Sequence, residues 1–155
     1  MDDTVAIYLD YNATAPVLPA AADLFARLLR DTPGNASSVH RYGQAAKAVV
    51  DAARDQVAAL VGGDAAEVVF TSGCTEADNL AMRGLVHARR SAGRPGIVVA
   101  GIEHEAVLNT AKALAKDGWE LATVPADADG VVDLGRLDAA VTERTAVVAL
   151  MLANN

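Results

Sequence analysis

The sequence predicts an α/β fold in which a mostly parallel sheet carries helices on both faces. From residue 67 onward, short apolar runs of strand length alternate with longer segments whose apolar residues recur at helical spacing. The composition fits a globular chain, because 52% of the 155 residues are hydrophobic and 21% are charged. That length is sufficient to bury a core.

The order of the expected elements follows from the same patterns. Before residue 67, apolar spacing predicts helices over about 19–29 and 44–61, and Gly62-Gly63 is expected to end the second one. Asp133 is a predicted N-cap of a short helix. The remaining elements are strands at 67–70, 97–100, 119–124 and 146–152 and helices at 74–88 and 105–117. The last strand is apolar on both faces, which predicts a central position in the sheet.

Charge and composition exclude several classes of protein. A net charge of -7 with scattered basic residues gives no footprint for nucleic acid or an anionic membrane surface. No apolar stretch reaches the roughly 18 residues of a membrane helix, and the start does not resemble a signal peptide. The lone cysteine cannot form an internal disulfide, so we expect a cytoplasmic protein. We predict no metal ligands.

The stretch TSGCTEADN, residues 71–79, joins a predicted strand to a predicted helix. With Gly73 near the N-cap, the amides of Cys74 and Thr75 are unpaired and lie at the positive end of the helix dipole, which favours a phosphate. The alternative is an ordinary capped helix in which Glu76 contributes to the cap. Cys74 has no nearby histidine or lysine in sequence to serve as its base, so a small residue packed against a ligand is the favoured interpretation.

His104 and the pair Asn154-Asn155 also follow predicted strands. Carboxyl ends of parallel strands meet at one edge, so these side chains and Thr75 are expected to face the same side. The imidazole could stack on a ligand ring or transfer protons, and the alternative is a histidine that caps its helix. The asparagine amides could bind a ligand or form a turn.

The chain resembles cysteine desulfurases of the class V aminotransferase group in five ordered motifs. These are YLDYNATAP at 8–16, GNASSVH at 34–40, VFTSGCTEADN at 69–79, IEH at 102–104 and LANN at 152–155. The resemblance implies the large domain of the fold type I transferases that depend on pyridoxal 5'-phosphate. It assigns residues 16–155 to the first part of that domain and residues 1–15 to the small domain.

The resemblance also implies site residues and partners. Gly73, Cys74 and Thr75 would bind the phosphate of the cofactor, His104 would stack on its ring and act in catalysis, and Asn155 would bind near the ring oxygen. The implied reaction removes sulfur from L-cysteine, giving L-alanine and an enzyme persulfide for iron-sulfur cluster or thio-cofactor synthesis. Implied partners are a second copy in a homodimer and a sulfur-acceptor protein.

In the family, the cofactor-binding lysine and the catalytic cysteine lie beyond the asparagine pair. We therefore expect a truncated N-terminal part that has no activity as these 155 residues alone. One alternative is a noncatalytic module that binds pyridoxal phosphate or another phosphate, or that binds a partner chain. Another is a related class V enzyme such as selenocysteine lyase.

Overall fold

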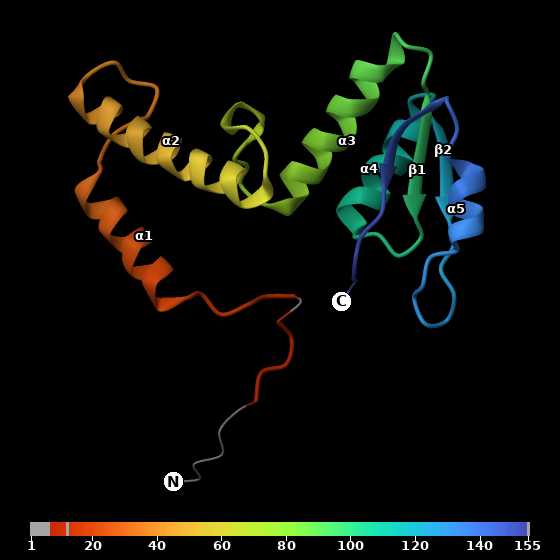
Figure 1. Ribbon diagram of the computed structural model, residues 1–155, viewed down its shortest axis with the longest axis horizontal. Coiled ribbons are helices and arrows are strands. Elements are labelled where there is room, and N and C mark those ends of the chain that lie inside the picture. Colours follow the sequence, from red (N-terminus) through yellow and green to blue (C-terminus); the bar gives the residue numbers. More distant parts are fainter. Residues whose placement is uncertain (1–6, 12, 155) are drawn as a thin grey trace. The chain divides into compact units, whose positions relative to one another are not determined.

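The computed structural model describes residues 7–11 and 13–154. The chain divides into two compact units, Met1–Phe70 and Thr71–Asn155. We call them the helical unit and the sheet unit, and Figure 1 labels most of their helices and strands. The predicted division at residues 15 and 16 between a small and a large domain stays a prediction.

The helical unit is built from two amphipathic helices and one short turn of helix. They are α1 (Pro19–Asp31), α2 (Arg41–Val61) and the 3-10 helix η1 (Ala65–Glu67). Pro19 stands at the start of α1, where its fixed φ suits a helix and its missing N–H costs nothing. Gly62 ends α2 as predicted, because its φ of 70° is left-handed and places its N–H against the carbonyl of Ala58.

The loop before α2 is closely packed on the first turn of that helix. The imidazole Nδ1 of His40 accepts a hydrogen bond of 3.3 Å from the Gly43 N–H and so caps α2. A Cβ at Gly43 would lie 2.2 Å from the carbonyl oxygen of Ser38. Only glycine allows this approach. With His40 as its N-cap, α2 begins at Arg41, three residues earlier than the apolar spacing predicts.

The predicted strand at 67–70 is wrong. Glu67 ends the 3-10 turn, and residues 68–70 are extended without belonging to a strand. Arg54 holds this segment instead, with its Nε donating to the Val68 carbonyl over 3.3 Å and its guanidinium 5.5 Å from the Phe70 ring centroid. A strand forms only through backbone pairing with a neighbour, and apolar composition alone does not provide one.

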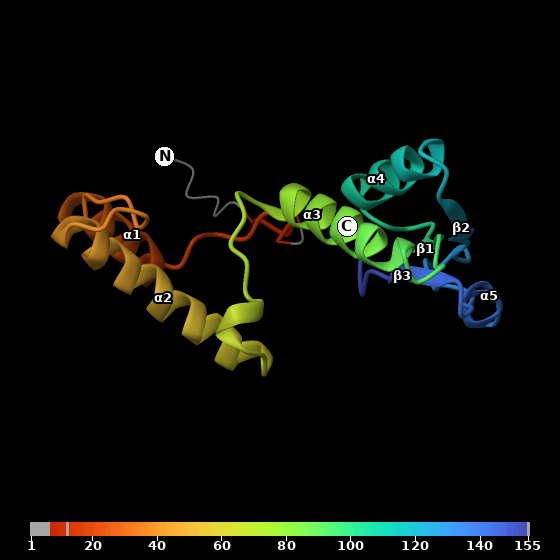
Figure 2. The same ribbon diagram turned by 90° about the horizontal axis from the view of Figure 1, so that it is seen from above.

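The sheet unit confirms the α/β prediction. Its elements are α3 (Cys74–Arg90), β1 (Gly96–Ala100), α4 (Glu105–Lys116), β2 (Glu120–Val124), α5 (Leu134–Ala140) and β3 (Thr145–Ala149). The strand order is β2-β1-β3, and both pairings are parallel, with Val98 opposite Ala122 on one side and Val148 on the other. Figure 2 shows α3 and α4 on one side of the strands and α5 on the other.

The predicted N-cap of α5 is also confirmed, since Asp133 Oδ1 accepts from the Arg136 N–H at 3.0 Å.

The core of the sheet unit lies between the strands and the helix pair α3 and α4. Ile97 and Val99 of β1 are fully buried against Val86 of α3 and Leu114 of α4. The predicted central position of the last strand is not found within residues 71–154, where β3 is an edge strand with Val148 41% exposed. Apolar residues on both faces predict burial of the faces, but they do not specify how many neighbours a strand has.

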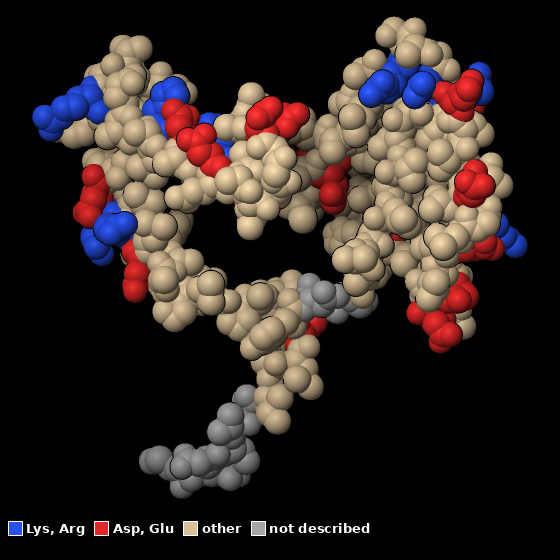
Figure 3. All heavy atoms as spheres, in the orientation of Figure 1, with Lys and Arg blue, Asp and Glu red and all other residues tan. Residues whose placement is uncertain are grey.

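The described surface carries charges of both signs. Figure 3 shows acidic and basic side chains on each unit, interspersed with uncharged surface. Among the described residues, no helix is both long enough and apolar enough to cross a membrane.

Candidate functional site

The N-terminus of α3 presents an exposed first turn. Gly73 is the N-cap, and its carbonyl accepts the Ala77 N–H at 3.1 Å. Residues 74–76 precede that first helical bond, so their N–H groups have no acceptor within the helix. All three side chains are exposed, and the space around Gly73 is open to 4 Å. This turn therefore combines free amides, the positive end of a helix dipole and room for a ligand.

The capping interpretation of Glu76 also holds. Its Oε2 accepts from the Ser72 hydroxyl at 2.6 Å and from the Ser72 N–H at 2.7 Å. The Ser72 hydroxyl and then its N–H hold the pKa of the Glu76 carboxyl below its ordinary value of 4.5. The Thr71 hydroxyl donates to the Gly73 carbonyl at 3.1 Å. The hydroxyls of Thr71 and Ser72 therefore both donate within the turn.

His104 caps α4 through its Nδ1, so its Nε2 is the ring nitrogen that could contact a ligand. Its Nδ1 accepts from the Ala106 N–H at 3.1 Å, which requires that Nδ1 carry no proton. The neutral ring then holds its proton on Nε2, and the side chain is exposed. The capping alternative and a ligand-binding role are compatible, because they use different nitrogens.

Thr75 and His104 line one hollow of about 480 Å³ in the sheet unit. Its wall comes from α3 and from the start of α4, and the lining residues are Thr75, Asn79, Arg83, His104, Glu105, Ala106, Asn109 and Thr110. The prediction that these two residues face the same side holds, although the strand expected before Thr75 is not formed. Gly73 and Cys74 immediately precede Thr75 and are not part of the lining. Cys74 is exposed.

A series of hydrogen bonds that the sequence did not predict joins α3 and α4 along the lining of the hollow. The buried Thr110 hydroxyl donates to Asn79 Oδ1 at 2.8 Å, and Asn79 Nδ2 donates to the Thr75 carbonyl at 2.9 Å. Arg83 Nε donates to the same Asn79 oxygen at 3.4 Å. The available signal was the spacing, since residues 75, 79 and 83 are four apart and share one helical face.

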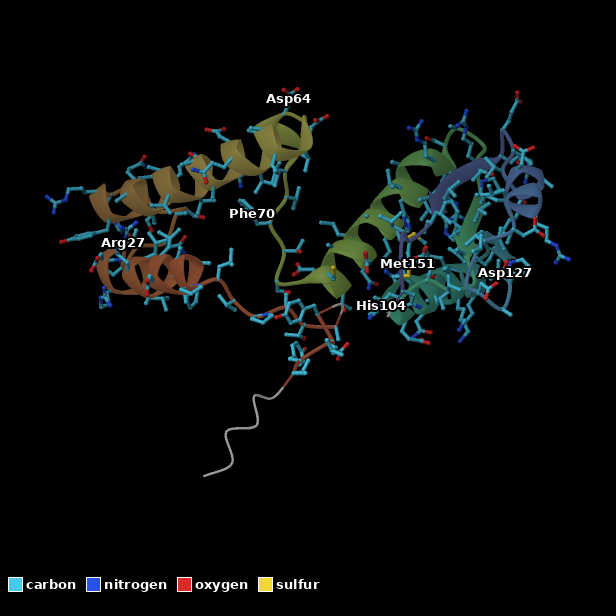
Figure 4. All side chains as sticks on the ribbon, turned by 60° about the horizontal axis from the view of Figure 1, so that its bottom comes forward. Arg27, Asp64, Phe70, His104, Asp127 and Met151 are labelled. Atoms are coloured by element: carbon cyan, nitrogen blue, oxygen red, sulfur yellow. The ribbon has the colours of Figure 1, made fainter. Side chains whose placement is uncertain are left out.

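The segment after β3 is bound to the loop after β1. Asn154 Nδ2 donates to the Ile102 carbonyl at 2.7 Å, and the Met151 N–H donates to the buried carboxylate of Glu103. Figure 4 shows His104 and Met151 close together at one end of the sheet unit. The predicted ligand-binding residue Asn155 lies outside the described residues.

The class-V aminotransferase profile matches residues 7–155. The chain belongs to the class-V aminotransferase family. The curated relatives of this family member include cysteine desulfurase IscS of Vibrio cholerae, 44% identical over 152 residues, and that of Pectobacterium carotovorum, 45% identical over 152 residues. Each match covers 96% of this chain and 37% of the relative.

Solved structures give the same family relationship. A protein described as NifS-like superposes with a TM-score of 0.85 at 35% identity over 92% of this chain, and DndA from Streptomyces lividans with 0.81 at 36% identity over 96%. SspA in complex with cysteine superposes with a TM-score of 0.81 at 28% identity over 91% of this chain. This class-V chain spans about two fifths of the length of these proteins, with coverages of 39%, 42% and 40%.

No metal centre is identified in the parts of this class-V chain that the structure describes. Residues 7–11 and 13–154 contain no group of three or more His, Cys, Asp or Glu side chains arranged to hold a metal ion. The groups at the candidate site are helix amides, the imidazole of His104, neutral polar side chains and the charged side chains of Arg83 and Glu105.

Proposed function

We propose that this chain carries part of the active site of a cysteine desulfurase that depends on pyridoxal 5'-phosphate. The supporting observation is that Thr75 and His104 line one hollow in a chain 44% identical to cysteine desulfurase IscS over 152 residues. The proposed reaction converts L-cysteine to L-alanine and leaves the sulfur as an enzyme persulfide. The solved structure of the relative SspA is a complex with cysteine, which supports cysteine as the substrate.

The described residues fit a phosphorylated aromatic cofactor. The open space at Gly73 and the exposed turn at 74–76 suit a phosphate, because free amides and the helix dipole both favour an anion. The exposed imidazole of His104, in the hollow that Thr75 also lines, suits a planar ring. When bound, pyridoxal 5'-phosphate supplies an electron sink for bonds at the substrate's α-carbon.

The proposed roles follow from where the chain places its groups. The amides of Cys74 and Thr75 would bind the phosphate, and Gly73 would leave room for it. His104 would pack against the ring and use Nε2 for proton transfer, since Nδ1 is engaged at the Ala106 N–H. Asn155 stays a predicted ligand of the cofactor ring. Cys74 is proposed as a wall of the phosphate site, not as the persulfide-forming thiol.

The three lysines of the sequence do not supply the cofactor-binding lysine of this proposal. Lys47 lies in α2 and pairs with Asp51, and Lys112 and Lys116 lie in α4. We therefore propose that the 155-residue chain alone is inactive and that activity belongs to a longer protein. For that protein we propose a homodimer in the cytoplasm that delivers sulfur to an acceptor protein.

The test is an assay of the protein produced from its complete reading frame. Loaded with pyridoxal 5'-phosphate, it is expected to form alanine and, with a thiol reductant, sulfide from L-cysteine, while the 155-residue chain forms neither. Parallel assays with L-selenocysteine distinguish a selenocysteine lyase. A cofactor-loaded protein that forms no alanine from L-cysteine would overturn the proposal.

A second measurement tests His104 itself. We expect His104→Ala to lower kcat by about 100-fold, within the range for loss of a positioned acid or base. His87→Ala is the matched control. His87 is exposed in the last turn of α3 and is not among the residues that line the hollow. Equal effects of the two substitutions would contradict the assignment.

A further inference from the structure

Two buried polar side chains stand within one short segment of the sheet unit. Glu103 is 7% exposed and Thr110 is 4% exposed, whereas the core around them is apolar. Burying a carboxylate or a hydroxyl costs free energy unless it is hydrogen-bonded. Each of these two groups forms its hydrogen bond with a different part of the chain, so the segment 103–110 has polar connections on both sides.

The first connection runs from Thr110 to the first turn of α3. Its hydroxyl donates to Asn79 at 2.8 Å, and the amide of Asn79 donates to the carbonyl of Thr75 at 2.9 Å. The same Asn79 oxygen also accepts from Arg83 Nε at 3.4 Å. Thr110 thus fixes the turn that carries the proposed phosphate-binding amides relative to α4.

The second connection runs from Glu103 to the segment after β3. The Glu103 carboxylate accepts the Met151 N–H, and 48 residues separate the two in sequence. One residue earlier, the Ile102 carbonyl accepts from the side chain of Asn154 at 2.7 Å. These two contacts place the chain that leads to Asn155 beside the loop that carries His104.

We propose that Glu103 and Thr110 are positioning residues. Thr110 connects the phosphate-binding turn to the middle of α4, and Glu103 connects residues 151–154, the asparagine segment, to the loop that bears His104. The proposal rests on the function proposed above for its ligand. Each residue serves one side of the site. Thr110 acts on the α3 turn through Asn79, and Glu103 acts on the segment that follows β3.

Hydrogen exchange of the cofactor-free protein, made from its complete reading frame, tests the two connections without any assay of function. Thr110→Val keeps the shape and removes the hydroxyl, and it is expected to speed exchange of the hydrogen-bonded amides of 77–79 by about fivefold, since one hydrogen bond is lost. Glu103→Met keeps the length and removes the acceptor, and it is expected to speed exchange of the Met151 amide by about fivefold or more. Each variant is expected to leave the other segment within twofold. Thr123→Val and Glu143→Ala, both exposed, are the matched controls.

Ligand affinity provides a second readout that a purely structural role would not move. Thr110→Val is expected to weaken binding of pyridoxal 5'-phosphate by about 3- to 10-fold and to leave binding of pyridoxal, which has no phosphate, unchanged. Glu103→Met is expected to weaken both ligands by similar factors, because the asparagine segment is proposed to contact the ring.

The following outcomes decide whether Glu103 and Thr110 are positioning residues. Faster exchange in both segments with either variant, or in neither segment, would overturn the positioning proposal. If Glu103→Met does not fold, Glu103→Gln keeps a weaker neutral acceptor, and unchanged Met151 exchange in that variant would also overturn it. If the unsubstituted protein binds neither ligand, the proposed function fails, while the exchange data still decide whether the two connections exist.

Discussion

The helical unit and the sheet unit both contain amphipathic helices, yet only one of them buries apolar side chains deeply. In the sheet unit, Val86, Ile97 and Leu114 are fully buried. In the described part of the helical unit, the buried helix residues are small, namely Gly43, Ala46 and Ala58. Its large apolar side chains are open, with Phe25 66%, Leu29 67% and Leu60 85% exposed.

The difference shows that an amphipathic pattern and a buried core are separate properties. A groove of about 440 Å³ in the helical unit is lined mainly by apolar residues of α1 and α2, including Phe25, Leu29 and Val50. Two helices alone have no second layer that covers such faces. A three-stranded sheet with helices provides that layer, so the sheet unit should carry most of the stability of the chain.

The largest expected effect is a test of this difference in the 155-residue chain. Leu114→Ala leaves a cavity in the core and should reduce the free energy of unfolding by about 3 kcal/mol, whereas Leu29→Ala should cost less than about 1 kcal/mol. Urea unfolding followed by circular dichroism measures both. Equal costs would show that the helical unit buries Leu29 as deeply as the sheet unit buries Leu114.

A second test compares one helical glycine from each unit. At Gly43 an added Cβ would lie 2.2 Å from the Ser38 carbonyl oxygen, so Gly43→Ala should cost roughly 2 kcal/mol despite the better helix propensity of alanine. Gly84 in α3 has open space around the same position, and Gly84→Ala should add up to about 1 kcal/mol. Opposite signs in thermal unfolding are expected. A stabilising Gly43→Ala would contradict the close packing of the loop before α2.

The sequence predicted the helices of both units well, because helical periodicity is local. It predicted the strands β1, β2 and β3 to within a few residues, and it failed at 67–70, where Arg54 binds the chain in place of a neighbouring strand. It also failed to predict that β3 lies at an edge. Strand pairing depends on distant parts of the chain, which a local pattern does not contain.

In the candidate site, too, some features could be predicted from the sequence and others depend on distant parts of the chain. The shared location of Thr75 and His104 was predicted from two strand ends, but only His104 follows a strand of the sheet, since none forms before Thr75. The contacts that hold the site could not be predicted, since Thr110 and Asn79 are 31 residues apart and Met151 and Glu103 are 48 apart. A buried polar residue in an apolar segment is visible in sequence, but its partner is not.

A third prediction concerns the segment that replaces the expected strand. Arg54→Lys keeps the charge but removes the planar guanidinium that lies 5.5 Å from the Phe70 ring centroid. We expect a loss of about 1 kcal/mol and faster amide exchange in residues 68–70, with Arg27→Lys in exposed α1 as the control. Unchanged exchange in 68–70 would mean that Arg54 does not hold this segment.

The smallest expected effect is a pH dependence of the cap at the N-terminus of α3, where Glu76 accepts hydrogen bonds from Ser72. Hydrogen bonds from Ser72 hold the pKa of the Glu76 carboxyl below 4.5, so their contribution is present above that pH and is lost as the pH falls through the folded pKa. Titration of the Glu76 carboxyl carbon by NMR should give a midpoint below 4.5, and Ser72→Ala should raise it only part of the way, because the Ser72 N–H still donates. Ser91→Ala at the other end of α3 should leave the midpoint unchanged. A Glu76 midpoint at or above 4.5 in the unsubstituted chain would contradict the hydrogen bonds from Ser72 that form the cap.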